Sequence, residues 1–325
     1  MRIVVADANL APHRDRFTAA LPDGADVAWC AGAPDAVAAA LPSADVFVGG
    51  RFTADMAETA GRLRLVHVFG AGTDRIDFDA LPDGVLVANA FGHERSIAEY
   101  VLAAAIVLRR DVLDQDRALR RGVWATSVYD GAIAQLHALR DGRVGLVGFG
   151  HIGARVWEAF RAFGCTGAAV TGSGRLDAAE HGLAWAADVS RLDDLMADSD
   201  VVVVSAPLTP ATTGLIGARQ LAALGGDGVL INVGRGPLVD ERALYDALAG
   251  RVVKAAAIDV WYRYPAARGE PATPSDLPFA ELTNVLMTPH SSGITTDTFR
   301  RRADDVAANI GRLARGERLH DLVRG

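Results

Sequence analysis

The sequence contains few cysteines and no excess of positive charge. Only Cys30 and Cys165 occur among its 325 residues, far apart and without the spacing of a disulfide framework or a zinc site. Acidic residues outnumber basic ones by 40 to 33, which gives a formal net charge of −7. A chain with this charge has no electrostatic attraction for nucleic acid, and unpaired cysteines suit a reducing compartment. We therefore expect a cytoplasmic protein that binds neither nucleic acid nor a structural metal.

Long apolar runs are also absent. The longest run, SIAEYVLAAAIVL at 96–108, contains Glu99 and is shorter than the ~20 residues that cross a bilayer. The first ten residues, MRIVVADANL, lack the pattern of a signal peptide and are typical of a strand that leads into a loop. We expect no membrane association, and we expect the long apolar run to be a buried helix.

The chain does contain two series of short apolar runs, separated by alanine-rich stretches that favour helices. Strands buried on both faces of a parallel sheet have this pattern, so the sequence predicts two doubly wound α/β domains. We place one domain at 1–95 with 294–325 and the other at 96–293, joined by helices over 96–110 and 296–313. The runs begin at Arg2, Asp26, Asp45, Leu65 and Val85 in the first series, and at Arg143, Thr166, Val201, Gly228, Ala255 and Asn284 in the second.

A glycine-rich turn follows the first strand of the second series. Gly148, Gly150 and Gly153 have the GxGxxG spacing, and an amphipathic helix follows them. The first glycine permits the turn, the second lets the backbone approach a pyrophosphate, and the third lets the helix pack on the strand. We predict a dinucleotide site in which His151 and Ile152 begin the helix; a plain glycine turn is the alternative.

The stretch VTGSGR at 170–175 has no Asp or Glu where a carboxylate usually binds the adenosine ribose. Without that carboxylate a 2′-phosphate meets no repulsion, while Thr171, Ser173 and Arg175 can donate hydrogen bonds to it. This favours NADP(H) as the cofactor. The alternative is that Arg175 is a solvated surface residue and that NAD(H) binds without its usual anchor.

Other segments follow in the order found in a known family. They are GAGTDRID at 70–77, SAPLTPATTGLI at 205–216, INVGRGPLVDERAL at 231–244, AIDVWYRYP at 257–265 and MTPHSSG at 287–293. With the glycine turn they make residues 65–309 resemble the D-isomer-specific 2-hydroxyacid dehydrogenases. The resemblance implies a Rossmann-like cofactor domain and a flavodoxin-like substrate domain with the cleft between them. It also implies reduction of a small 2-oxo acid to a D-2-hydroxy acid with NAD(P)H.

Two side chains suit this chemistry. Arg235 lies between two glycines after a buried strand, a costly place for a guanidinium unless it meets an anion, and its planar fork can bind a carboxylate. His290 can carry a proton near neutral pH, as a general acid must. A structural ion pair for Arg235 and a core histidine for His290 are the alternatives. The resemblance assigns both residues to catalysis.

The resemblance implies further contacts. The amides of Gly70, Ala71 and Gly72 would hold the substrate carboxylate, although a simple turn is the alternative. Asp259 would face the nicotinamide amide. The remaining implied contacts are Ala206, Pro207 and Thr212 on the adenine side and Val233 and Gly234 on the nicotinamide ribose.

The chain departs from the family beside the histidine. Five residues after Asp259 the family has a Glu that favours the imidazolium, and this chain has Tyr264. A phenol is uncharged at neutral pH, so His290 should be less biased toward its charged form. Glu270 would be the partner if residues had been inserted before it. We favour Tyr264, because positions directly after a strand are geometrically fixed, and the related formate dehydrogenases also carry a neutral residue here.

Two other functions stay open. One is oxidation of formate or phosphite with NAD(P)+, which the neutral Tyr264 permits; the other is a silent nucleotide-sensing or corepressor protein, which would not need Arg235 and His290. The family also implies a homodimer, formed with a projecting segment that corresponds to 114–142. Trp124, Val128 and Tyr129 in this segment would be unusual on a monomer surface.

Overall fold

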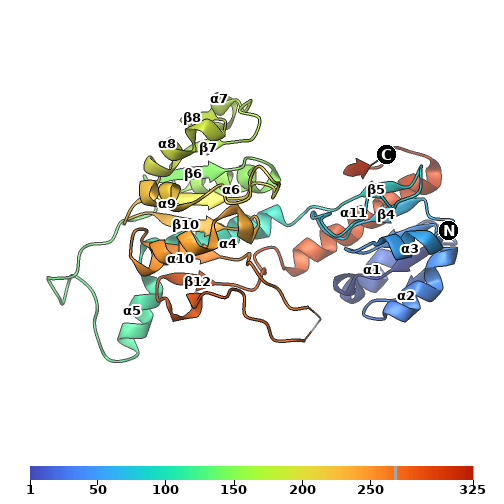
Figure 1. Ribbon diagram of the computed structural model, residues 1–325, viewed down its shortest axis with the longest axis horizontal. Coiled ribbons are helices and arrows are strands. Elements are labelled where there is room, and N and C mark those ends of the chain that lie inside the picture. The colour runs from blue at the N-terminus through green and yellow to red at the C-terminus, as the bar shows by residue number, and fades with distance from the viewer. Residues whose placement is uncertain (267–268, 325) are drawn as a thin grey trace. The chain divides into compact units, whose positions relative to one another are not determined.

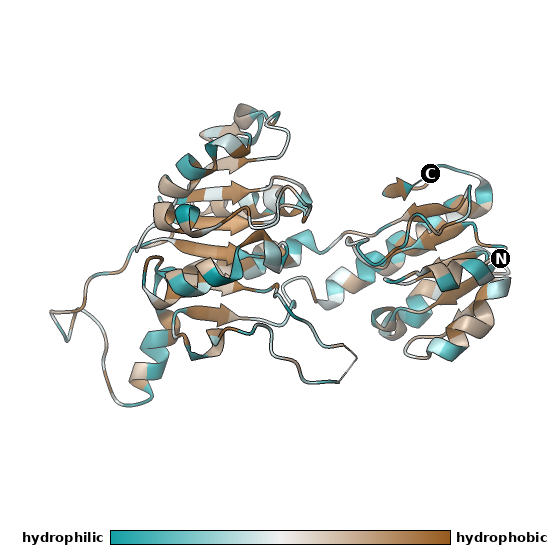
Figure 2. Cartoon of the chain, viewed as in Figure 1, coloured by the Kyte–Doolittle hydropathy of each residue, from teal (hydrophilic) through white to brown (hydrophobic). Residues whose placement is uncertain are grey.

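The computed structural model describes residues 1–266 and 269–324, and the chain divides into two compact units (Figure 1). Unit 1 contains Met1–His93 and Ile294–Gly325, and unit 2 contains Glu94–Gly293. The strands of both units are mostly hydrophobic, whereas the helices carry polar residues as well (Figure 2). Each unit therefore encloses its sheet in its own core, and each is described by itself.

Unit 1 has a six-stranded sheet in the order β13-β5-β4-β3-β1-β2. Strands β1 to β5 run parallel, and β13 pairs antiparallel with β5 at the edge. Apart from β13, this order is that of the flavodoxin-like fold, as the sequence predicts. The strands are β1 Arg2–Val5, β2 Asp26–Trp29, β3 Val46–Val48, β4 Leu65–His67, β5 Leu86–Ala88 and β13 Leu322–Arg324.

The helix α11, Thr296–Arg315, covers one face of this sheet together with α1, Arg14–Ala19. Its buried apolar residues recur every three or four positions, which is the spacing of one helical face. They include Ala303, Val306, Ala307 and Ile310. The short helices α2, Pro34–Ala40, and α3, Ala54–Thr59, pack on the other face.

Unit 2 has a seven-stranded sheet in the order β12-β11-β10-β9-β6-β7-β8, with every pair parallel. The order reverses between β6 and β9, which makes this the switch point of a Rossmann-like sheet. Val144 of β6 aligns with Val201 of β9 across it. The strands are β6 Arg143–Val147, β7 Thr166–Val170, β8 Trp185–Ala187, β9 Val201–Val204, β10 Val229–Asn232, β11 Ala255–Ile258 and β12 Val285–Met287.

Helices cover both faces of the unit 2 sheet. On one face, α4, Glu94–Arg109, packs with α6, His151–Ala162. On the other face lie α8, Leu192–Ala197, α9, Ala218–Leu224, and α10, Glu241–Ala249. The remaining helices are α5, Val112–Leu119, and α7, Ala178–His181. The predicted class, two doubly wound α/β sheets, is therefore confirmed.

Two strands were not expected from the sequence. No residue of β8 or β13 is fully buried, and each strand has only three residues at an edge of its sheet. β13 has only two apolar residues, Leu322 and Val323, whereas β8 lies in LAWAA at 183–187, an alanine-rich stretch of the kind that favours a helix.

The segment after α5 runs away from the sheet of unit 2 and holds no helix or strand between 120 and 142 (Figure 1). Several of its large apolar side chains are exposed, among them Trp124, Val128 and Tyr129. Within 1–266 and 269–324, no helix combines the length and the apolarity that crossing a membrane requires.

Candidate active site

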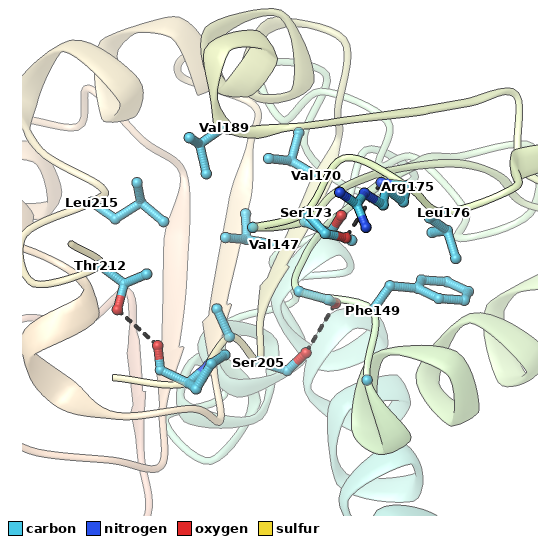
Figure 3. A pocket seen from close by; sticks show the side chains of 16 residues that line it. Val147, Phe149, Val170, Ser173, Arg175, Leu176, Val189, Ser205, Thr212 and Leu215 are labelled. Carbon is cyan, nitrogen blue, oxygen red and sulfur yellow. Dashed lines mark hydrogen bonds between the residues drawn. The ribbon is translucent and has the colours of Figure 1, made fainter. Parts of the chain in front are cut away.

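A cavity of about 490 Å³ lies at the carboxyl ends of β6, β7 and β9, where the strand order reverses (Figure 3). Nucleotides bind at such switch points in open α/β sheets. Eight of the predicted cofactor contacts line it, namely Gly148, Gly150, Thr171, Ser173, Arg175, Ala206, Pro207 and Thr212. Six other predicted contacts, all in the described part of the chain, are not in its lining: His151, Ile152, Gly153, Val233, Gly234 and Asp259.

The three glycines of the turn have different surroundings. Gly148 has a φ of 96°, and a Cβ there would lie 2.7 Å from the backbone nitrogen of Ala206. A Cβ at Gly153 would collide with the carbonyl oxygen of Gly148. At Gly150 no atom lies within 4 Å of the Cβ position, so the backbone at the start of α6 opens toward the cavity. These surroundings suit a pyrophosphate held by the positive end of α6.

The cavity has one charged residue in its lining, Arg175. Its backbone N–H donates to Oγ of Ser173 at 3.3 Å, and Oγ1 of Thr171 accepts the N–H of Gly174 at 3.1 Å. The Arg175 side chain is exposed, and it forms no ion pair with a carboxylate of the described residues. Arg175 and Ser173 lie together on one side of the cavity, across from Thr212 and Leu215 (Figure 3). This end of the cavity therefore carries positive charge.

Most of the remaining lining was not anticipated from the sequence. Apolar side chains form it, two at the ends of the buried strands β6 and β7 and the others on the connections that follow strands. They are Val147, Phe149, Val170, Leu176, Val189 and Leu215. Such a wall suits the flat faces of an adenine ring.

Three predicted site residues follow three adjacent strands of the same sheet. Arg235 comes after β10, Asp259 after β11 and His290 after β12. Arg235 is half-buried, and its Nη1 donates to the carbonyl oxygen of Gly234 at 2.9 Å. Its charge acts on His290 and on Tyr264, because it lowers the pKa of both groups. The guanidinium and the imidazole therefore share one corner of unit 2.

Asp259 is fully buried and holds the loop that follows β12. Its Oδ1 accepts the hydroxyl of Thr288 at 2.6 Å and the N–H of Ser291 at 2.8 Å, and its Oδ2 accepts the N–H and the hydroxyl of Ser292. Since Thr288 donates to the carboxylate, Tyr100 must donate to Thr288, at 2.9 Å. The sequence analysis missed this network. Its one signal in the sequence is the group of hydroxyl-bearing residues beside the histidine. The contact of Asp259 with a nicotinamide amide stays a prediction.

His290 lies in this loop with a φ of 55°, in the left-handed region. Its Nδ1 is 3.1 Å from Oη of Tyr264, whereas Glu270 is exposed. His290 is exposed, but the protein atoms around its ring displace part of the surrounding water. This loss of water lowers the pKa of His290 below the usual 6.5. The charge of Asp259 opposes this shift and the charge of Arg235 reinforces it.

The predicted carboxylate loop follows β4 in unit 1. The carbonyl oxygen of Gly70 accepts the N–H of Ala90 at 3.0 Å, and that of Ala71 accepts Nδ2 of Asn89 at 2.8 Å. The N–H groups of Gly70, Ala71 and Gly72 have no acceptor among the residues that the structure covers. Free N–H groups in a glycine turn are able to bind an anion.

Comparison with known proteins gives a match over most of unit 2. Residues 102–292 match the profile of the family described as "D-isomer specific 2-hydroxyacid dehydrogenase, NAD binding domain". The D-3-phosphoglycerate dehydrogenase of Mycobacterium tuberculosis is 35% identical over 99% of this chain and 58% of its own length. That of Escherichia coli is 33% identical over 79% of this chain and 60% of its own length. The chain thus spans 58% to 60% of the length of these curated relatives.

Solved structures share the fold of the whole chain. A D-isomer specific 2-hydroxyacid dehydrogenase from Lactobacillus delbrueckii, in its NAD complex, has a TM-score of 0.81 at 22% identity, with 100% of both chains covered. An acyclic imino acid reductase in complex with NADPH and D-Arg has a TM-score of 0.80 at 23% identity, with 99% of this chain and 100% of the other covered. At these identities the likeness concerns the fold alone.

Proposed function

Because the chain belongs to the D-isomer-specific 2-hydroxyacid dehydrogenase family, we propose that it reduces a small 2-oxo acid to a D-2-hydroxy acid with NADPH. In this proposal unit 2 is the cofactor domain and unit 1 is the substrate domain. One observation carries this proposal: Arg235 and His290 lie close together at the carboxyl ends of the strands of unit 2. The cavity lies at the same edge of this sheet.

The cofactor assignment rests on the charge of the cavity. Its lining has no carboxylate and one guanidinium, that of Arg175. A carboxylate at this end would accept the ribose 2′-hydroxyl and repel a 2′-phosphate, whereas a guanidinium attracts the phosphate. We therefore propose NADP(H) rather than NAD(H). The room at Gly150 and the positive end of α6 suit the pyrophosphate of either nucleotide.

The chemistry follows from the guanidinium of Arg235 and the imidazole of His290. The bound nicotinamide would supply a hydride to C2 of the 2-oxo acid. Arg235 binds the substrate carboxylate and stabilises the negative charge that develops on the C2 oxygen. His290 delivers the proton to that oxygen from Nε2, because its Nδ1 is turned toward Tyr264. Asp259 keeps the histidine loop in place through its four hydrogen bonds.

Unit 1 offers a carboxylate contact of its own in this proposal. The N–H groups of Gly70, Ala71 and Gly72, which have no acceptor in the described chain, bind the substrate carboxylate. This assignment is independent of the substrate's side chain, so it fits any small 2-oxo acid.

We also propose a homodimer. The segment after α5 exposes 60% of Trp124, 78% of Val128 and 69% of Tyr129, and apolar side chains gathered in this way are typical of a protein interface. Sedimentation at micromolar concentration is expected to give a dimer for the parent chain. A monomer at that concentration would contradict this assignment.

A substrate panel tests the function. Oxidation of NADPH and of NADH is followed by absorbance with glyoxylate, hydroxypyruvate, phenylpyruvate and phosphonopyruvate. Because the relatives in Mycobacterium and Escherichia are named for 3-phosphoglycerate, that compound is tested in the oxidative direction, with formate and phosphite beside it. Turnover of a 2-oxo acid with NADPH preferred supports the proposal. Turnover of formate or phosphite alone would favour the second chemistry, and binding of NADPH without any turnover would favour a silent nucleotide sensor.

A further inference from the structure

The hydroxyl of Tyr264 lies between a fixed donor and the ring of His290. Its Oη is 3.1 Å from the backbone nitrogen of Trp261 and 3.1 Å from Nδ1 of His290. A phenol has one hydrogen to donate and two positions that accept. The N–H of Trp261 can only donate, so it fills an accepting position. The hydroxyl keeps its hydrogen and one accepting position, so it is able to donate to Nδ1 of His290.

The direction of this hydrogen bond sets the tautomer of the neutral imidazole. When Nδ1 accepts a hydrogen bond it carries no proton, so the ring proton is on Nε2. The other charged groups that face the ring are Arg235, which opposes a second proton, and Asp259, which favours one. Removal of water from the ring lowers its pKa, so the imidazolium is the minor form at neutral pH. A reduction that depended on the imidazolium would therefore be slow there.

We propose that Tyr264 and His290 form a proton relay, in which Nε2 of His290 protonates the developing alkoxide while the hydroxyl proton of Tyr264 passes to Nδ1. This proposal rests on the proposed function. The hydride brings two electrons to C2, the C2 oxygen gains one proton, and Tyr264 becomes a phenolate. The starting state returns when Nδ1 gives its proton back to the phenolate and Nε2 of the exposed His290 takes a proton from water. Tyr264 thus acts through His290, as a positioning and relay residue.

The surroundings of Tyr264 act on a transient phenolate in both directions. Burial of the ring and the charge of Asp259 raise the pKa of Tyr264 above its usual 10, and the N–H of Trp261 and the charge of Arg235 offset part of this rise. A phenol is in any case a far stronger acid than the alcohol that the reduction forms, since its ordinary pKa is about 10. Without the phenol, neutral His290 would have to become an imidazolate in order to give up its Nε2 proton.

The pH dependence of kcat/KM separates this relay from a structural role. The parent chain is expected to keep its reduction rate from about pH 6 to about pH 9. Tyr264→Phe leaves only the imidazolium as proton donor, so its rate should approach that of the parent below the pKa of His290 and fall roughly tenfold for each pH unit above that pKa. Tyr264→Phe with a rate lowered by the same factor at every pH would overturn the relay.

Tyr262→Phe is the matched control. Tyr262 is a neighbouring tyrosine whose hydroxyl donates to the carbonyl oxygen of Val239 at 3.0 Å, and it has no hydrogen bond to the histidine. Its replacement also removes one hydroxyl, but any loss of rate should be equal at all pH values. A pH-dependent loss in Tyr262→Phe equal to that of Tyr264→Phe would contradict a specific role for Tyr264.

A measurement without turnover checks the hydrogen-bond direction. The nitrogen NMR signals of His290, assigned by their loss in His290→Gln, should report the Nε2–H tautomer in the parent chain near pH 8. A proton on Nδ1 in the parent would overturn the relay even if the enzyme is active. If no substrate of the panel is turned over, the proposed function fails and the relay fails with it. If turnover occurs and either test gives the opposing result, only the relay fails.

Discussion

Two histidines at the ends of strands have opposite surroundings. His67 ends β4 in unit 1 and is fully buried, and both of its ring nitrogens have fixed partners. Nδ2 of Asn309 donates to its Nε2 at 3.0 Å, so the ring proton is on Nδ1, which donates to the carbonyl oxygen of Val68 at 3.2 Å. Burial lowers the pKa of His67 to about 4.

His290, after β12 in unit 2, has one protein partner, Tyr264, and its Nε2 makes no hydrogen bond to any described residue. The phenol can both donate and accept, so this imidazole can change its protonation state without losing its partner. The comparison teaches that a histidine with two fixed partners is part of the core, whereas one with a free nitrogen and an adaptable partner can transfer a proton.

The largest expected effect is a loss of activity, and it belongs to His290. His290→Gln removes the proposed proton donor, so kcat should fall by roughly 100- to 10,000-fold, the usual contribution of general acid catalysis. The free energy of unfolding should stay near that of the parent, because the ring is exposed. Steady-state kinetics and urea unfolding measure the two quantities. An unchanged kcat would mean that His290 takes no part in the reaction.

The next effect concerns stability in acid and belongs to His67. Because its pKa is lowered from 6.5 to about 4 in the folded chain, the unfolded state binds a proton at a higher pH than the folded state does. The stabilisation is complete above about pH 6.5 and is lost as the pH falls to about 4, by about 3 kcal/mol. Urea unfolding at a series of pH values measures this loss.

His67→Gln provides the control for that experiment. The variant cannot titrate in this range, so its free energy of unfolding should depend less on pH than that of the parent. His290 contributes to the acid sensitivity of both proteins, since its pKa is lowered in both. Equal pH dependence of the two proteins would show that His67 is not the group responsible.

Much of the fold could be predicted because its causes are local. Inner strands are buried on both faces and leave continuous apolar runs, and the positions of Gly148 and Gly153 admit no Cβ, so the GxGxxG spacing has a steric origin. The short edge strands β8 and β13 were missed, because β13 has only two apolar residues and the run that contains β8 is rich in alanine.

The site was less predictable, because its geometry depends on contacts between distant residues. Counting along the chain left both Tyr264 and Glu270 as partners of His290, and Tyr264 was favoured only because positions directly after a strand are geometrically fixed. The network of Asp259 with Thr288 and Tyr100 joins residues up to 188 positions apart, and no local pattern reports it. The family assignment, in contrast, is confirmed, because it depends on motif order.

The smallest expected effect is a change in KM for the cofactor. It extends the comparison from two histidines to two arginines, one held by a hydrogen bond in the interior and one exposed on the cavity. Arg109 is buried and donates to the carbonyl oxygen of Ala138, whereas Arg175 is exposed on the cavity. Arg175→Ala should raise KM for NADPH by roughly 10- to 100-fold, the value of a charged hydrogen bond, and leave KM for NADH almost unchanged. Arg155→Ala is the control, because Arg155 is a partly exposed arginine that pairs with Glu158 and is not in the cavity lining. An equal change for both nucleotides in Arg175→Ala would remove the basis for NADP(H).

Transfer of label from cofactor to substrate tests the central claim most directly. The chain is incubated with NADPH that carries deuterium at both C4 positions and with the best 2-oxo acid of the panel. We predict one deuterium at C2 of a D-configured 2-hydroxy acid, formed at a rate that falls by about 100-fold or more in Arg235→Ala. A product with protium from water at C2, or an Arg235→Ala variant that transfers deuterium at the parent rate, would contradict the account.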